Sequence, residues 1–435
     1  MHTPKLVIKI ERGRIFAEAN DVSDDDGPPC NTTYARDLTS EPLSKATIDA
    51  FMAWVEEKTP RLRDAADFSL FGWHLWEFLF RGEIAEAFAV QMNAAKSRRT
   101  PMRLELWIDP GESPAIASVP WEFLYCPPRS EGRDGYFLGT HTSLTFNRTN
   151  ASTANARDIR ITEQPRILIV TACPPGFERV LWRPVVECIA AAIAGRLDGG
   201  RGDAASVASP SVRVVHDPKD EAALCEALRW RPHILQFIGH GQQDGSLGKL
   251  AMLSAEPVWL SGKQLVAVMD AAAPEHRPRL IVLHACEGAR VAGAAALAPR
   301  LGFGAVAPTL LGQDIPAVVA MQYEIDQGSA IDFSVKLYSD LLANRPIHQA
   351  VQAARLSLMS LRRNVPRAFG TPVLYMSGTD GVMFAPVVAA AQRGPSISRA
   401  GVATEDVARV EPARPAAVES APFTAAGMDQ RAGGQ

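Results

Sequence analysis

The sequence predicts an α/β fold whose mostly parallel sheet is flanked by helices on both faces. Short apolar runs rich in β-branched residues recur at 166–171, 233–241 and 280–283, and such runs are typical of strands buried on both faces of a parallel sheet. Stretches with helical spacing, at about 182–197 and 220–230, lie between the first two runs. This alternation of strand and helix indicates a doubly wound sheet.

Length and composition limit what the chain can be. With 435 residues it has room for two domains, or for one large domain with an extension. The formal net charge of −3, without any block of one sign, disfavours direct nucleic-acid binding. The start lacks a signal-peptide core and no apolar run approaches the ~20 residues of a membrane span, so we expect no membrane partner.

The cysteines indicate a reducing compartment. Six of them stand far apart and none belongs to a C-x-x-C pair, in a chain too long to need disulfides for stability. We therefore expect a cytoplasmic protein, in which a catalytic thiol stays usable. The six are Cys30, Cys126, Cys173, Cys188, Cys225 and Cys286.

Changes in composition divide the chain into three expected parts. A polar, alanine-rich stretch at 149–164 suggests a boundary, so that residues 1–160 form an N-terminal α/β extension and residues 161–386 the main domain. Residues 387–435 are rich in Ala, Pro, Gly, Arg and Glu. Such a segment cannot bury enough apolar surface to offset its ordering entropy, so we expect a disordered tail.

The elements of the extension can be placed in order. We expect a strand, an exposed loop, two helices, a further strand and a hairpin-like pair, at residues 6–10, 19–42, 44–57, 70–97, 102–108 and 121–147. The second helix carries many aromatic residues between Leu70 and Phe80, and these need cover. They either pack against the sheet or form an exposed surface that docks a partner.

Two of the predicted strands end in residues that suit chemistry. The run at 280–283 leads through His284 to Cys286, and the strand at 233–241 ends with His240 between two glycines. In open α/β sheets, sites form in the crevice at the carboxyl ends of the strands. If the two strands are parallel neighbours, His240 and Cys286 emerge side by side.

A histidine that ends one strand as HG, followed 46 residues later (286 − 240) by a cysteine in x-A-C-x-G, resembles the clan CD cysteine peptidases. The caspase version, Q-A-C-[RQG]-G, differs at His284 and Glu287, so the caspase preference for aspartate is not implied. The closer resemblance is to the CHAT family, a group of caspase-like domains also related to separase. Further stretches that resemble this family lie at 119–125, 136–138, 315–326, 333–355 and 369–375.

The resemblance implies a cysteine endopeptidase that works with a His–Cys dyad and no cofactor. Cys286 would attack the peptide carbonyl as a thiolate. His240, whose ordinary pKa is near neutral, would favour the thiolate and later protonate the leaving amine. The backbone N–H groups of Gly241 and Cys286 would bind the oxyanion.

The residues that set specificity are less defined. His284 is expected on the same face of its strand as Cys286, as a hydrogen-bonded histidine beneath the pocket, a substrate contact or, together with Cys286 and His240, a metal ligand. The spacing of a zinc motif is absent, so we predict no metal. Glu324 and Asp326 follow the next strand and are candidates for an acidic S1 pocket. The alternative is a pocket that takes an apolar P1 residue.

The family resemblance also implies protein partners. CHAT proteins are often encoded beside effectors that they cleave, including in bacterial antiviral defence and regulated death. The expected substrate is such an effector, and a regulatory partner or activator is expected as well. Two other functions stay open: a catalytically silent scaffold that uses the aromatic helix for assembly, and a thiol-dependent acyl transferase or amidase that acts on a small molecule.

Overall fold

The computed structural model describes residues 3–11, 13–20, 36–39, 44–128, 134–150, 159–177, 180–199, 210–244, 247–255, 259–285, 303–377 and 380–384. The strands within these ranges are β1 (Lys5–Glu11), β2 (Arg14–Ala19), β3 (Arg36–Thr39), β4 (Met102–Ile108), β5 (Tyr125–Cys126), β6 (Tyr136–Phe137), β7 (Leu144–Thr149), β8 (Arg166–Thr171), β9 (Ser211–His216), β10 (Ile234–Asp244), β11 (Leu247–Ala251), β12 (Trp259–Ser261), β13 (Leu280–Ala285), β14 (Ala317–Met321) and β15 (Pro372–Met376).

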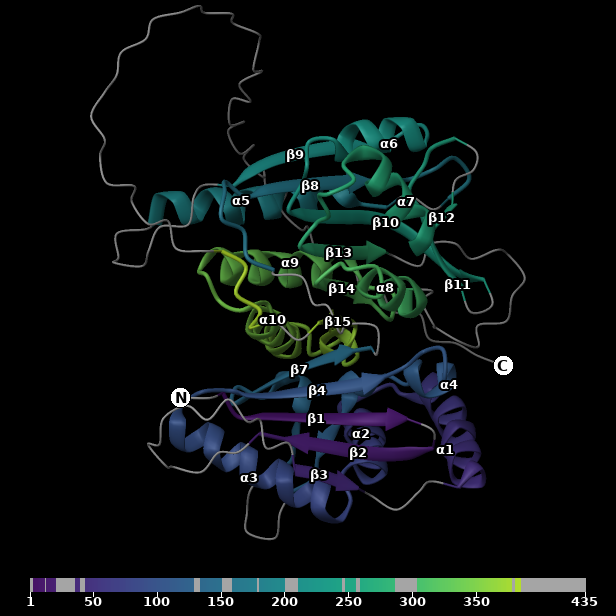
Figure 1. Ribbon diagram of the computed structural model, residues 1–435, viewed down its shortest axis with the longest axis vertical. Coiled ribbons are helices and arrows are strands. Elements are labelled where there is room, and N and C mark those ends of the chain that lie inside the picture. The colour runs from purple at the N-terminus through teal and green to yellow at the C-terminus, as the bar shows by residue number, and fades with distance from the viewer. Residues whose placement is uncertain are drawn as a thin grey trace, which may run out of the picture. The chain divides into compact units, whose positions relative to one another are not determined.

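The helices complete the α/β arrangement (Figure 1). They are α1 (Lys45–Lys58), α2 (Ala65–Leu79), α3 (Gly82–Arg98), α4 (Pro114–Ala117), α5 (Trp182–Gly199), α6 (Glu221–Leu228), α7 (Gly262–Ala272), α8 (Phe303–Leu311), α9 (Gln327–Leu342) and α10 (Ile347–Leu361), with short 3-10 turns that include η2 (Trp121–Phe123). In the ranges given above, no helix combines the length and the apolar character that crossing a membrane requires.

One large mixed sheet runs through the described part of the chain. Its strand order is β12-β11-β10-β13-β14-β15-β7-β4-β1-β2-β3, and β8 pairs with β10 and with β9. The strands β8, β10, β13 and β14 are mutually parallel, while β15 is antiparallel to β14. The two-stranded hairpin β5–β6 stands apart from this sheet.

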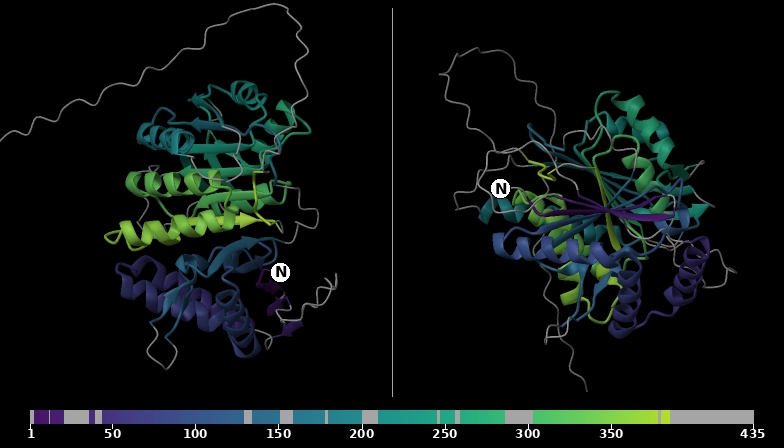
Figure 2. Two further views of the ribbon diagram at one scale, coloured as in Figure 1. Left: turned by 90° about the vertical axis from the view of Figure 1, so that its left-hand side faces the viewer. Right: turned by 60° about the horizontal axis from the view of Figure 1, so that its bottom comes forward.

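Helices cover both faces of the parallel strands, as the sequence predicts. The helices α5, α9 and α10 contact one another in one layer, and α6, α7 and α8 form the other (Figure 2). The side chains of β14 and β15 are buried on both faces, which explains why their sequences are unbroken apolar runs. The prediction of a mostly parallel sheet with helices on both faces is therefore confirmed.

Two expectations for the first part of the chain were wrong. The single helix expected at 70–97 is two helices, because the chain turns at Arg81 and continues into Gly82 with a φ of +49°, a conformation that favours glycine. A capping box at Asp64 starts the first of them earlier than expected. The loop expected at 19–42 contains the strand β3, and the rest of it from 21 to 35 and from 40 to 42 lies outside the described residues.

The sheet is continuous between the expected extension and the expected main domain. Strand β7 pairs with β4 on one side and, through Arg148 and Tyr375, with β15 on the other. Contacts group Met1–Val387 into one compact unit. The boundary proposed at residue 160 falls between β7 and β8, and the tail expected from 387 lies outside the described residues.

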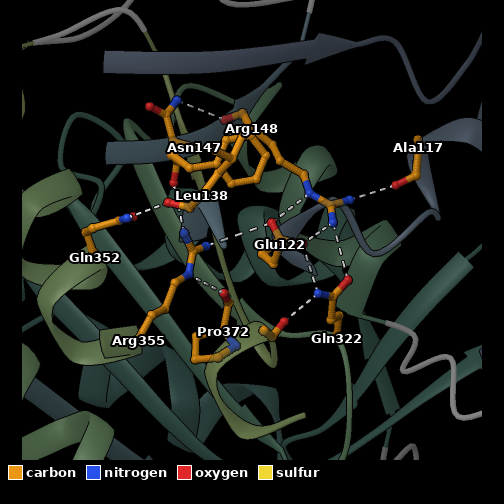
Figure 3. Close-up of polar contacts among 11 residues, drawn as sticks. Ala117, Glu122, Leu138, Asn147, Arg148, Gln322, Gln352, Arg355 and Pro372 are labelled. Carbon is orange, nitrogen blue, oxygen red and sulfur yellow. Dashed lines mark hydrogen bonds and ion pairs between the residues drawn. The ribbon is translucent and has the colours of Figure 1, made fainter. Parts of the chain in front are cut away.

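A buried polar network joins these two parts of the sheet (Figure 3). Glu122 of η2 is fully buried and accepts hydrogen bonds from the guanidinium of Arg148 through both carboxylate oxygens. Gln322, which follows β14, donates to Glu122 at 2.8 Å and accepts from Arg148 at 3.3 Å. Arg355 of α10 donates to the carbonyls of Phe146 and Pro372, at 3.0 and 2.9 Å, and its Nη2 lies 3.8 Å from Glu122.

The network holds two guanidinium groups for one carboxylate. Burial disfavours the charge on Arg148, but the carboxylate of Glu122 outweighs it and raises the pKa of Arg148. Burial also disfavours the charge on Arg355. Because its guanidinium lies farther from Glu122, the carboxylate compensates less, and the pKa of Arg355 is lowered to about 10. Glu122 therefore compensates both cations, and Arg148 more strongly than Arg355.

Glu122→Ala should unfold the protein at a clearly lower urea concentration than the wild type. The substitution leaves two buried guanidinium groups without a counter-charge, and removing one partner of a buried ion pair typically costs about 3–5 kcal/mol. Circular dichroism during urea unfolding measures the change. In the control Glu57→Ala, which removes an exposed partner of Arg61, the midpoint should stay unchanged. Equal midpoints for Glu122→Ala and the wild type would contradict the stabilising role of the network.

Candidate active site

The carboxyl ends of four parallel strands meet at one edge of the sheet. Strand β10 lies between β8 and β13 over Ile234–Ile238, and β14 continues the parallel order beyond β13. Ile238 pairs with His284, and Gly239 pairs with Ala285. The two predicted strands are therefore parallel neighbours, and the chain positions just before His240 and Cys286 stand opposite each other. Cys286 itself lies outside the described residues.

Gly239 allows the close approach of strands at this edge. A Cβ at this position would lie 2.8 Å from the carbonyl oxygen of Ala172 and 2.5 Å from the ring of Phe237. Real Cβ atoms do not come so close, so only glycine fits without movement of the backbone. The glycine that precedes His240 is thus required by packing between β8 and β10.

His240 occupies the point where β10 changes partners. Before it, β10 pairs with β8 and β13; from His240 onward it pairs antiparallel with β11, with His240 opposite Ala251 and Gly241 opposite Leu250. His240 is 1% exposed. Its ring lies 5.2 Å from the ring of Phe177, between ring centroids. Gly241, the predicted oxyanion residue, is buried in the same strand.

His284 lies buried on the face of the sheet that α9 covers. Its ring packs 5.8 Å from Phe333 of α9, and neither ring nitrogen has a hydrogen-bond partner among the described residues. The hydrogen-bonded histidine considered from the sequence is thus not seen within those ranges. Desolvation lowers the pKa of His284 to about 4, so the ring is neutral at pH 7.

His240 and His284 share that face. Gln236 accepts a hydrogen bond from the hydroxyl of Tyr338 in α9, which places Gln236 on the α9 side of β10. Residues two and four positions farther along a strand point the same way, so Ile238 and His240 lie on that side too. Because paired residues of parallel strands face the same side, His284 joins them.

The two candidate acids lie in different settings. Glu324 and Asp326 are both exposed in the segment after β14, but only Asp326 has a capping role. Asp326 caps the N-terminus of α9 and accepts from the backbone N–H of Ser329 at 2.9 Å and from its hydroxyl. Partial burial opposes ionisation of Asp326, but the hydrogen bonds from Ser329 outweigh it and lower its pKa. The cap gives Asp326 a structural role at the start of α9. Glu324 has no such capping role, so its carboxylate is the better candidate for a substrate contact.

The same edge holds groups that the sequence did not single out. Phe177 contacts His240 and also lies 5.4 Å from Trp259 of β12, so an aromatic pair stands beside the histidine. Thr171 hydrogen-bonds His216 at 2.8 Å, one strand farther out. A loop phenylalanine and a strand tryptophan carry no pattern that marks them in the sequence. Throughout the described ranges, no group of three or more His, Cys, Asp or Glu side chains is placed to hold a metal ion.

Acid should destabilise the wild type more than His284→Leu. The folded pKa of His284, about 4, lies below the ordinary value of 6.5, so the unfolded chain takes up the proton first as the pH falls. Stability is then full above pH 6.5 and is lost progressively towards pH 4; at pH 5 the loss is ~2 kcal/mol, from about 1.4 kcal/mol per pH unit.

Urea unfolding at pH 7 and at pH 5 gives the free energy of unfolding of each protein at both pH values, and the difference between the two values is the loss. His284→Leu should lose ~2 kcal/mol less than the wild type, and the exposed His74→Leu should lose as much as the wild type. An equal loss in all three proteins would show that His284 does not titrate in this way.

Comparisons with known proteins give a family. The model of the CHAT domain matches residues 71–398, a range that begins within α2 and includes Glu122, His240 and Cys286. Among proteins with curated descriptions, none matches the chain.

Three solved structures resemble this chain at low identity. Separase in the Saccharomyces cerevisiae separase–securin complex has 17% identity and a TM-score of 0.37, over 67% of this chain and 17% of that chain. The Arg-specific cysteine proteinase gingipain R has 10% identity and a TM-score of 0.41, over 78% of this chain and 75% of that chain. A complex of the Porphyromonas gingivalis RgpB pro- and mature domains gives a TM-score of 0.39 at 10% identity, over 78% of each chain. This chain thus spans about a sixth of the separase chain.

The family model covers well over half of the chain, and the fold has the mostly parallel, helix-flanked sheet that the motifs imply. This protein belongs to the CHAT domain family.

Proposed function

We propose that the protein is a cysteine endopeptidase in which His240 and Cys286 form the catalytic dyad. The observation that carries the proposal is the register of two parallel strands: Gly239, directly before His240, pairs with Ala285, directly before Cys286. A histidine and a cysteine that follow paired residues of neighbouring strands leave the sheet at the same edge, where α/β folds bind their ligands.

The chemistry follows from the dyad. The thiolate of Cys286 adds to the carbonyl carbon of the scissile bond, and the backbone N–H groups of Gly241 and Cys286 bind the oxygen that becomes negative. His240 gives a proton to the leaving amine, which breaks the C–N bond and leaves an acyl-enzyme. Water then adds to the thioester while His240 takes its proton, and breaking of the C–S bond releases the acid product and returns Cys286 to the thiolate.

The substrate proposed for this site is a partner protein. By analogy with the CHAT family, it is an effector encoded nearby, cleaved in bacterial antiviral defence or regulated death under the control of an activator, in the cytoplasm. Glu324, which is exposed after β14, is the carboxylate best suited to a basic substrate side chain. His284 would contribute a neutral ring beneath the site.

Alkylation of the six cysteines tests the dyad without knowledge of the substrate. Iodoacetamide labelling followed by mass spectrometry should show Cys286 reacting at pH 6–7 at least tenfold faster than the other thiols, because a histidine partner lowers the thiol pKa. His240→Ala should abolish that difference, and the exposed His74→Ala should keep it. Labelling of Cys286 that matches the other thiols in all variants would sink the proposal.

The same labelling separates the other two functions. A silent scaffold predicts slow labelling of Cys286. An acyl transferase or amidase predicts fast labelling and acylation by small substrates, with no cleavage when the protein is expressed together with proteins encoded nearby. Cleavage of such a protein by the wild type and not by Cys286→Ala supports the endopeptidase.

Gly239→Ala should slow the labelling of Cys286 at least tenfold at pH 6–7. The added Cβ meets the carbonyl of Ala172 and the ring of Phe237, so the end of β10 must move and carry His240 with it. Gly111→Ala is the control, since its Cβ would meet only a flexible side-chain oxygen of Asp109 at 3.2 Å. If Gly239→Ala labels like the wild type, the position of His240 does not depend on this close approach.

A further inference from the structure

A pocket lies between α1 and α2. These helices belong to the N-terminal part of the chain, whereas the candidate active site lies at the ends of β10 and β13. The volume of the pocket is about 250 Å³, and its walls include Phe51, Trp54, His74, Glu77, Phe78 and Arg81. The rings of Phe51 and Phe78 stack at 3.9 Å, and the ring of Trp54 meets that of His74 edge-on at 4.8 Å. The interior is thus aromatic, and one carboxylate and one guanidinium belong to its lining.

Two large apolar side chains stand exposed on the same helix. Leu70 is 55% exposed and Trp73 is 46% exposed, although α2 buries Phe71, Leu75 and Trp76. Leu70, Trp73 and Glu77 follow a spacing of three and four residues, so they form one stripe along α2. The indole N–H of Trp73 donates to Glu77 at 3.1 Å, which places Trp73 at the rim of the pocket.

The protruding residue and the pocket have matching chemistry. The pocket has a volume of about 250 Å³, and an indole ring placed in it would lie against the rings of Phe51, Trp54 and Phe78. On pairing, the indole N–H of Trp73 would leave Glu77 of its own chain and donate to Glu77 of the other copy, so that the hydrogen bond is exchanged. Tryptophan is also among the residues that contribute most to interfaces when a pocket of the partner receives it.

A projection and a matching pocket on one surface are what a two-fold symmetric interface needs. In such an interface each contact occurs twice, because the same patch is used by both copies. We propose that two copies of this chain pair through α2, with Trp73 of each copy in the α1–α2 pocket of the other.

The charges along α2 favour this pairing. A two-fold axis across α2 sets the two helices antiparallel, with their macrodipoles opposed. Asp64 and Asp67 lie at the N-terminal end of α2, and Arg81 lies just beyond its C-terminal end. In the antiparallel pair, the Arg81 of each copy approaches the acidic end of the other. The face is therefore complementary to itself in shape and in charge.

Sedimentation equilibrium of the full chain, at about 1–100 μM, tests the proposal. The wild type should be a dimer at the upper end of this range. Trp73→Ala should raise the dissociation constant at least tenfold, and His74→Trp, which fills the pocket from within its own chain, should do the same. Because Trp73 and His74 are exposed, neither substitution should change the thermal midpoint of the diluted monomer.

Leu361→Ala is the matched control, since Leu361 is an exposed apolar residue, 63% accessible, on α10. It should leave the dissociation constant unchanged. Charge reversal in Arg81→Glu should weaken the dimer more at low salt than at high salt. A wild type that stays monomeric over the whole range, a dimer that Trp73→Ala leaves intact, or an equal loss in Leu361→Ala would each overturn the proposal.

Discussion

The parallel pairing of β10 with β13 is the interaction on which the candidate site depends. Residues 234–241 of β10 and 280–284 of β13 are buried on both faces, and a shift of their register by one residue would turn apolar side chains and their polar neighbours to the wrong sides. The register is therefore strongly specified, and it fixes which residues leave the sheet together. Gly239 adds a second constraint, because the approach of Ala172 leaves no room for a side chain there. The position of His240 is thus constrained by the packing around it.

The buried strands were predictable because burial on both faces leaves a plain mark: a short run of β-branched residues, as in β8 and β13. The parallel pairing of the strands that lead to His240 and Cys286 was predictable for the same reason. The break between α2 and α3 was not, since it depends on the backbone angles of a single glycine inside an otherwise helical pattern. The strand β3 has a polar sequence and pairs at the edge of the sheet, so no apolar alternation marks it.

The network around Glu122 could not have been derived from local patterns. Its partner Arg148 lies 26 positions away, Gln322 lies 200 away, and Arg355 is a helix residue that reads as solvent-exposed by type. Such a group forms only when the sheet brings β7, β14 and β15 together. The polar cluster links the segment before β7 to the segment after β14, and Gln322 begins the stretch that leads to Glu324. The segment that leads to Glu324 is thus held in part by Glu122 and Arg148, which lie among the first 150 residues of the chain.

The order of strands in the sheet differs from their order along the chain, and this has a consequence for synthesis. Strand β7 borders β4 on one side and β15 on the other, and about 230 residues (372 − 144) separate the start of β7 from the start of β15. At roughly 5–20 residues per second, a ribosome needs about 10–45 s to cover that distance. During this time the edge of β7 that later pairs with β15 has no partner strand. Glu122 can then pair with Arg148 but not yet with Arg355. A nascent chain therefore carries an unpaired strand edge that a chaperone could shield, and this edge is covered only when β15 has emerged.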